Sequence, residues 1–287
     1  MAASYASVDD ADGNAPGNLL SECKRSLGSP TSPLTTVTIQ NIGVVTSDQL
    51  LTICGSNDLC IIPEGVTLQV TSSINVGALV VRGKVEWNDS TQDEENAFLC
   101  AGYVAMEGNG SWDMNIQNKL SWIYIKDNGA VHSKLRSRSF GGMGNSTVNI
   151  RGRELVRTWS LLSETIVPGG DTMKLLHNPH YMNWHVGDRI AISSTEKSSN
   201  GFSQSFKIKD ISEDGTILVD HVSERTFEAN FIPTENGMEP LIMSAEVVNL
   251  DRNIVITGDD FTHERCGKFL GTFYIIFSFF LGFLCLK

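Results

Sequence analysis

The alternating stretches Val66-Thr67-Leu68-Gln69-Val70 and Val85-Glu86-Trp87 decide the predicted fold. Apolar and polar residues alternate in them with a period of two, which is typical of β-strands with one buried face. Glycine, asparagine, aspartate and serine separate such runs, as short strands require. Further runs occupy Leu79–Val81, Tyr103–Met106, Trp122–Ile125, Thr147–Ile150, Arg189–Ile192, Thr216–Val219 and Asn253–Ile256. We therefore predict an all-β chain.

The intervals between these runs distinguish two β architectures. Val85 and Val104 are 19 residues apart, and Val104 and Tyr124 are 20 apart. A β-sandwich usually has a turn every ~8–12 residues, whereas a solenoid of stacked parallel coils has longer intervals. We therefore expect a parallel β-helix-like solenoid over Leu34–Gly258, and a β-sandwich is the alternative. The residues expected inside are Val66, Leu68, Leu79, Val81, Val104, Ile123, Val148, Ile150, Ile190 and Ile192.

Composition excludes some classes of protein. The chain has 287 residues, 41% of them hydrophobic and 19% charged, so global disorder is excluded. Its 22 Lys and Arg against 33 Asp and Glu leave a net charge of −11. A nucleic-acid binder needs a basic face to displace counterions from phosphate. We therefore expect no nucleic-acid partner.

The two ends differ from the middle. Residues 1–33 contain few apolar residues and are predicted to be a disordered leader, without the apolar run of a secretory signal. Phe269–Leu286 holds 18 uncharged residues, which as a helix would span ~27 Å, close to a bilayer's hydrocarbon core. We predict a transmembrane helix at 269–286. The alternatives are sequence of another origin joined to a truncated domain, and a buried core helix.

Several linked motifs in the middle of the chain resemble one family. They occupy Cys60–Leu68, Leu79–Trp87, Thr158–Leu162, Asn183–Ile190 and Ala245–Ile254. Together they resemble the eight-glycine domain family, whose members include fibrocystin-like receptors, a cell-migration-inducing hyaluronan-binding protein and a cell-surface hyaluronidase. The resemblance runs from about Leu50 to Gly258 and implies a right-handed β-helix outside the cell, with carbohydrate as its ligand.

The resemblance also divides the chain. We expect an eight-glycine-type β domain at 34–153 and further β-helix coils at 154–265. In fuller members the β-helix continues past the position that matches Asn253 and Ile254, so much of it is absent here. The β domain is expected outside the cell and attached to a membrane through the C-terminal segment. The absence of a secretory signal conflicts with that placement.

Arg252, Asp259 and Asp260 are the best local set for glycoside hydrolysis. That reaction needs two carboxyl groups, one of them protonated, and an arginine could hold a uronate carboxylate. The alternative is an ordinary turn rich in aspartate. We favour no catalysis, and we expect no cofactor.

A basic stretch is the candidate ligand-binding site. It surrounds the glycine turn at 141–144 and suits an anionic polysaccharide, although a solvated face is the simpler interpretation. In an extended strand, alternation puts its first three cations on one side. The residues are Lys134, Arg136, Arg138, Arg151 and Arg153, with Arg157 beyond them.

Trp184, Gly187 and Asp188 form a turn motif that we interpret as structural. Gly187 suits a positive-φ corner, Asp188 suits bonds to turn amides, and Trp184 suits packing inside. Asp188 as a catalytic acid is the alternative. His177, His180 and His185 lie nearby, but Pro179 prevents a regular helix that would align them, so we expect no metal.

Sequons and cysteines bear on the compartment. Asn88, Asn109 and Asn145 each begin a glycosylation sequon in turn-like surroundings. Cys54 and Cys60 could close a small loop, whereas Cys23, Cys100 and Cys266 have no evident partner and Cys285 lies in the apolar C-terminal segment.

Two classes of function follow. The first is a cell-surface or extracellular module that binds carbohydrate or acts in adhesion. The alternative is a truncated polysaccharide-cleaving enzyme of the hyaluronidase type.

Overall fold

The computed structural model describes residue 23 and residues 33–40, 43–193, 203–232 and 241–259, together with the backbone of 274–276. The chain is mostly β and divides into two compact units. The first comprises Met1–Arg153 and Asn253–Lys287, and the second comprises Glu154–Arg252. The second unit is therefore inserted into the sequence of the first.

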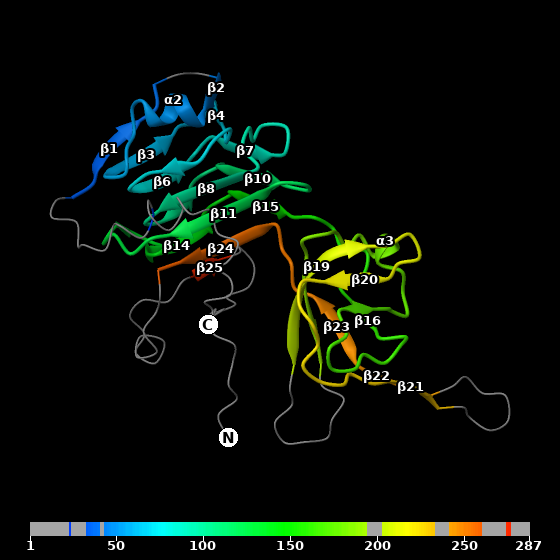
Figure 1. Ribbon diagram of the computed structural model, residues 1–287. Helices are drawn as coiled ribbons and strands as arrows, with labels where there is room; N and C mark the ends of the chain where they lie inside the picture. Colours follow the sequence, from blue (N-terminus) through cyan, green and yellow to red (C-terminus); the bar gives the residue numbers. More distant parts are fainter. Residues whose placement is uncertain are drawn as a thin grey trace, which may run out of the picture. The chain divides into compact units, whose positions relative to one another are not determined.

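Three sheets of parallel strands make up most of the first unit (Figure 1). The first sheet contains β1 (Thr35–Thr38), β3 (Asp58–Ile62), β6 (Ala78–Val81), β9 (Val104–Met106), β14 (Ser139–Gly142) and β25 (Tyr274–Ile276). The second contains β2 (Gly43–Thr46), β4 (Val66–Gln69), β7 (Lys84–Asn88), β10 (Ser111–Asn115) and β15 (Thr147–Arg151). The third contains β5 (Ile74–Asn75), β8 (Asn96–Ala101), β11 (Leu120–Ile125) and β24 (Ile254–Gly258).

From β3 to β11 the chain visits these sheets in a fixed rotation, so each strand pairs with the strand three places along the chain. The helix α2 (Ser47–Leu51) follows β2 and begins with a capping box in which Thr46 and Gln49 exchange hydrogen bonds. An antiparallel pair, β12 (Val131–His132) and β13 (Arg136–Ser137), precedes β14.

The three sheets differ in what covers their outer faces. In β6 all four residues are buried, because Tyr103, Ala130 and Leu135 pack on the side away from the main core. Phe98, Trp122 and Tyr124 form a similar cluster on the third sheet. The second sheet instead alternates buried and accessible residues in β4, β7 and β10. It therefore presents a polar outer face to solvent.

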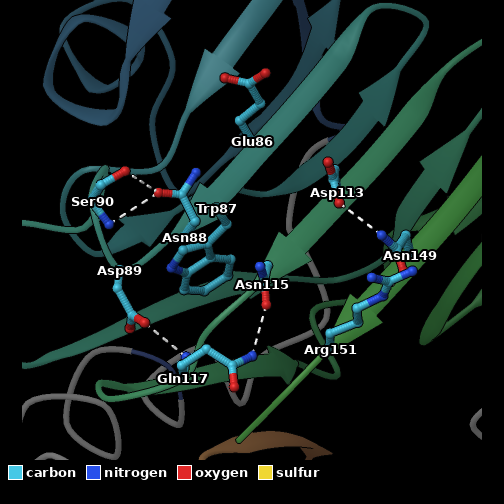
Figure 2. Close-up of a pocket in the computed structure, with 10 residues that line it drawn as sticks. All are labelled: Glu86, Trp87, Asn88, Asp89, Ser90, Asp113, Asn115, Gln117, Asn149 and Arg151. Carbon is cyan, nitrogen blue, oxygen red and sulfur yellow. Dashed lines mark hydrogen bonds between the residues drawn. The ribbon is translucent and has the colours of Figure 1, made fainter.

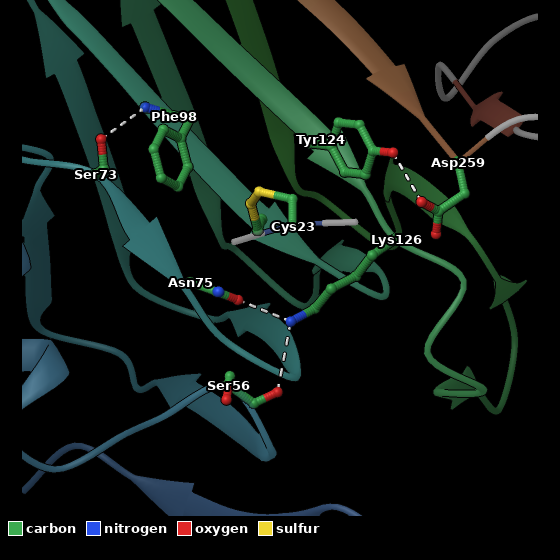
Figure 3. The surroundings of a disulfide bond; sticks show 9 residues. Cys23, Ser56, Ser73, Asn75, Phe98, Tyr124, Lys126 and Asp259 are labelled. Carbon is green, nitrogen blue, oxygen red and sulfur yellow. Dashed lines mark hydrogen bonds between the residues drawn. A yellow bond between two sulfur atoms is a disulfide. The ribbon is translucent and has the colours of Figure 1, made fainter. Parts of the chain in front are cut away.

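Two disulfides tie the first unit together. Cys54 bonds Cys60, six residues later, with Cα atoms 6.0 Å apart. Cys23 bonds Cys100 in β8, with Cα atoms 5.8 Å apart, and lies in the cluster of Phe98 and Tyr124 (Figure 3). The Cys23–Cys100 bond joins residues 77 positions apart and attaches Cys23 to the third sheet.

The second unit is antiparallel. Its main sheet has the order β16 (Trp159–Leu161), β23 (Glu246–Asn249), β18 (Arg189–Ile192), β19 (Gln204–Ile211), β20 (Ile217–Val219) and β17 (Thr172–Met173). A separate ribbon pairs β21 (Ala229–Ile232) with β22 (Leu241–Ser244), and α3 (Pro179–Met182) is one short helix. Trp184, Ile190 and Phe206 lie in the core of this unit.

The prediction of one parallel β-helix-like solenoid over Leu34–Gly258 is wrong. Between Trp159 and Asn249 the strands pair antiparallel, including β18, where Ile190 and Ile192 were expected inside a parallel coil. A tight turn with Gly215 at φ +85° joins β19 directly to β20. Such short connections return the chain in the opposite direction, whereas parallel strands need a crossover.

The prediction of an apolar helix at 269–286 is wrong for the part of that segment that the structure describes. Tyr274–Ile276 forms β25, which pairs parallel with β14 and so satisfies its backbone groups through a sheet. The rest of that segment, and all of the leader at 1–33 except Cys23 and Pro33, lie outside the described residues. In the described part of the chain, no helix is both long and apolar enough to cross a bilayer.

Candidate functional site

A groove of about 560 Å³ lies on the outer face of the second sheet, over β7, β10 and β15 (Figure 2). Its lining is almost entirely polar and comprises Glu86, Trp87, Asn88, Asp89, Ser90, Asp113, Asn115, Gln117, Asn149 and Arg151.

Alternation along three adjacent strands creates this lining. In β7 and β10, Val85, Trp87, Trp112 and Met114 are buried, so the residues between them project outward. The parallel register then forms two rows across the strands. One row is Glu86, Asp113 and Asn149, and the other is Asn88, Asn115 and Arg151. Neighbours are ~4.8 Å apart across strands and ~6.6 Å apart along one strand.

Hydrogen bonds hold the polar side chains of the groove in place. Arg151 Nε donates to Asn149 Oδ1 over 3.2 Å, and Asn149 Nδ2 donates to Asp113 Oδ1 over 2.9 Å. Gln117 Nε2 donates to Asn115 Oδ1 over 2.7 Å. Arginine has five N–H donors in a fixed fork, and one is used in this chain of bonds. The groove thus offers oriented donors and acceptors.

Glu86 is held in its ionised form. The hydrogen bond from Lys84 lowers the pKa of Glu86 below its usual value, and Gln69 contributes a weaker bond in the same direction. The same bond to Glu86 raises the pKa of Lys84. Both partners are partly exposed, so the pair adds little stability. Its consequence is an ionised carboxylate at the edge of the groove whose charge is largely balanced by Lys84.

A loop after β7 forms one end of the groove. The Asp89 carboxylate accepts the backbone N–H groups of Gln117, Asn118 and Lys119 over 2.8 to 3.2 Å. Asn88 Oδ1 accepts the N–H groups of Ser90 and Thr91, each over 3.0 Å. These bonds fix the loop against the chain that leaves β10.

One requirement of glycoside hydrolysis can be checked at Glu86. A hydrolase needs one carboxyl group that keeps its proton near neutral pH, usually in an apolar environment that raises its pKa. Glu86 has the opposite environment, because its bond to Lys84 favours the carboxylate. Glu86 is therefore unsuited to act as a general acid.

The predicted catalytic set is divided between the two units. Arg252 belongs to the second unit, is exposed, and donates to the carbonyls of Asn249 and Asp251. Asp259 belongs to the first unit and is 7% exposed. Asp260 lies outside the described residues. The Asp259 carboxylate accepts hydrogen bonds from the Tyr124 hydroxyl and the Asp127 N–H.

The basic residues also occupy different environments. Lys134 and Arg136 are exposed, whereas Arg138 is 3% exposed and donates to the Asp259 carbonyl over 2.6 Å. Arg136 and Arg138 have φ values of 70° and 53°, so they do not continue the extended strand that would align Lys134, Arg136 and Arg138. Arg153 is half-buried, and its backbone N–H donates to Asn253 Oδ1. Of the five predicted residues, Arg151 alone lines the groove.

The turn motif at Trp184 lies in the second unit. Trp184 is 2% exposed, and its Nε1 donates to the Arg157 carbonyl over 2.8 Å. Gly187 has a φ of +97°. Asp188 is buried, and its carboxylate accepts the His185 N–H and the Asn249 side-chain amide. These contacts close the turn onto β23.

The nearby histidines bond to separate partners. His177 pairs with the Ser160 hydroxyl, His180 with the Ser212 carbonyl and His185 with the Asn183 side chain. Across the described residues, no group of three or more His, Cys, Asp or Glu side chains could hold a metal ion.

The three glycosylation sequons differ in their structural surroundings. Asn109 and Asn145 are exposed in turns before β10 and β15, whereas Asn88 lines the groove.

Of the residues that line the groove, Asn88 and Arg151 were among the predicted site residues, whereas Glu86, Asp113, Asn115 and Asn149 were not. The signal was present in Lys84–Asn88, Ser111–Asn115 and Thr147–Arg151, which alternate apolar residues with amides and charges. Alternation identifies an outward side chain but not its neighbour on another strand. The register that joins the three strands supplies that neighbour.

In comparisons with known proteins, no family model and no curated sequence matches the chain.

Proposed function

We propose that the protein is an extracellular or cell-surface module that binds carbohydrate in the groove over β7, β10 and β15. The observation that carries this proposal is the double row of amide, carboxylate and guanidinium groups fixed by hydrogen bonds. Sugar hydroxyls both donate and accept, so they match a surface that offers oriented donors and acceptors together. Because the partners are held before the ligand arrives, little side-chain entropy is lost on binding.

The charges of the groove favour a neutral glycan. Glu86, Asp89 and Asp113 supply three carboxylates, against the guanidinium of Arg151 and the ammonium of Lys84, which is paired with Glu86. Like charges repel, so a polyuronate would meet an unfavourable potential in this groove. An anionic polysaccharide was the expectation from the basic stretch, most of which lies elsewhere.

The two disulfides support the extracellular placement. Disulfides persist in oxidising compartments and are rare in the cytosol. The Cys23–Cys100 and Cys54–Cys60 bonds are both in the first unit, which carries the groove.

The proposal is tested by glycan binding with a matched pair of variants. The unchanged chain, made with its disulfides in a bacterial periplasm, where no N-linked glycan is added, is applied to an array of neutral, amino and uronate glycans. Asn115→Ala is expected to weaken neutral-glycan binding about tenfold, the effect of one lost hydrogen bond of ~1.4 kcal/mol. Asn96→Ala is the control, because Asn96 is also exposed on a strand but belongs to the third sheet.

Three outcomes contradict the proposal. No binding to any glycan would remove carbohydrate as the ligand. An equal loss in both variants would separate binding from the groove. Shortening of the glycan chains by the protein would support the hyaluronidase-type alternative instead.

A further inference from the structure

One sequon lies inside the groove. Asn88, the last residue of β7, begins the triplet Asn88-Asp89-Ser90, and all three of its residues line the groove. In a secreted protein such a triplet is an acceptor for N-linked oligosaccharide. Figure 2 shows Asn88 and Ser90 facing each other at one end of the polar rows.

The local geometry of Asn88 suits modification. Its amide oxygen accepts hydrogen bonds from the Ser90 N–H, the Ser90 hydroxyl and the Thr91 N–H. These bonds form an Asx turn that holds the side chain in one orientation. They all use the oxygen, so none of them occupies the amide nitrogen, which is the atom that carries an N-linked sugar.

The surroundings of Asn88 differ from those of the other two sequons. In the parallel register Asn88 is the neighbour of Asn115, which is the neighbour of Arg151. Sugars attached at Asn88 would therefore meet the groove's own donors and acceptors. Asn109 and Asn145 lie in exposed turns outside the groove lining.

We propose that Asn88 carries an N-linked oligosaccharide whose first sugars lie in the groove. The Asn88 amide nitrogen forms a bond to the anomeric carbon of an oligosaccharide carried on a lipid pyrophosphate. The bond from that carbon to the pyrophosphate breaks, the lipid pyrophosphate leaves, and the amide nitrogen loses one proton. This inference rests on the extracellular placement in the proposed function, and it adds that an occupied Asn88 closes the groove to other glycans.

The test compares one sequence with and without the modification. The full chain with Asn109→Gln and Asn145→Gln, behind an added signal peptide, is made in eukaryotic secretory cells and in a bacterial periplasm. Peptide mass spectrometry measures the fraction of Asn88 that carries a glycan, both in this variant and in the unchanged chain. Carbodiimide labelling then compares Asp113, exposed in the groove, with Glu64, which is exposed outside its lining.

The expected result is a glycan at Asn88 and labelling of Asp113 reduced at least about threefold in the glycosylated form, with Glu64 unchanged. The inference is overturned if Asn88 carries no glycan in either the double variant or the unchanged chain made in eukaryotic secretory cells. It is also overturned by a glycan at Asn88 with Asp113 labelled equally in the two forms. Neither readout uses an added ligand. Failure of the unglycosylated form to bind any glycan would therefore count against the proposed function alone.

Discussion

Tyr124 donates its phenolic O–H to Asp259 Oδ1 over 2.7 Å, joining two buried residues that are 135 positions apart (Figure 3). The Asp127 backbone N–H donates to the other carboxylate oxygen, and Arg138 donates to the Asp259 carbonyl. Asp259 directly follows β24, the strand with which the chain re-enters the third sheet after the inserted unit. The carboxylate therefore fastens that returning strand to β11 and its following loop.

Tyr124→Phe is expected to lower the free energy of unfolding by about 1–3 kcal/mol. The substitution removes a donor and leaves a buried carboxylate with one fewer hydrogen bond. Urea unfolding measures the change. Tyr181→Phe is the control, because Tyr181 is 81% exposed and should have almost no effect. Equal midpoints for Tyr124→Phe and the unchanged chain would show that this bond contributes nothing.

Lys126 is expected to make stability rise with pH. It is 1% exposed, its Nζ donates to Asn75 Oδ1, and burial lowers its pKa to about 8 from 10.5. Between these two pKa values the unfolded chain binds the proton more strongly than the folded chain, so raising the pH favours folding. Below about pH 8, Lys126 is protonated in both the folded and the unfolded chain, so the cost of burying its charge is fully present.

The gain between pH 7 and 10 is of order 3 kcal/mol at most, since one pKa unit corresponds to ~1.4 kcal/mol. Urea unfolding at a series of pH values measures it. Lys126→Met removes the titrating group and should flatten this part of the profile. A profile with the same slope in both proteins would assign the pH dependence to other groups.

Gly187→Ala is expected to destabilise the second unit by about 1 kcal/mol. Gly187 has a φ of +97°, and no atom lies within 4 Å of the position that a Cβ would occupy. The penalty therefore comes from backbone strain and not from a clash. Gly55→Ala is the control, since Gly55 does not have a positive φ and its Cβ would make an ordinary contact. Thermal unfolding of the two variants should separate them.

Trp184→Ala is expected to cost about 3–5 kcal/mol. The ring is buried in the core of the second unit, and its removal leaves a cavity as well as an unpaired Arg157 carbonyl. Trp159→Ala is the control, because Trp159 is 44% exposed. Similar losses in the two variants would mean that the Trp184 ring is not the packing centre of this turn.

Removing the Cys23–Cys100 disulfide is expected to destabilise the first unit more than removing Cys54–Cys60. The two bonds span 77 and 6 residues, and a longer closed loop restricts the unfolded chain more. Chain entropy predicts losses of ~4.5 and ~2.4 kcal/mol for the two double Cys→Ala variants. Urea unfolding measures both. A larger loss for Cys54–Cys60 would contradict the chain-entropy account here.

Local pattern determined the strands and much of the core. Period-two alternation predicted the strands around Val66–Val70 and Val85–Trp87, and Leu68, Val81 and Ile190 are buried as expected. Val148 and Ile150 are only half-buried. They lie on β15, the last strand of its sheet, and alternation cannot tell a central strand from a terminal one.

Strand direction was decided by tertiary structure. The alternation of apolar and polar residues is the same in parallel and antiparallel strands, so β10 and β18 look alike in sequence. The connection that follows determines how each strand pairs. Alternation alone was enough to predict which side chains of Lys84–Asn88, Ser111–Asn115 and Thr147–Arg151 face outward. Only the register of β7, β10 and β15 placed Glu86 beside Asp113, and Asn88 beside Asn115, because those contacts join residues 27 positions apart along the chain.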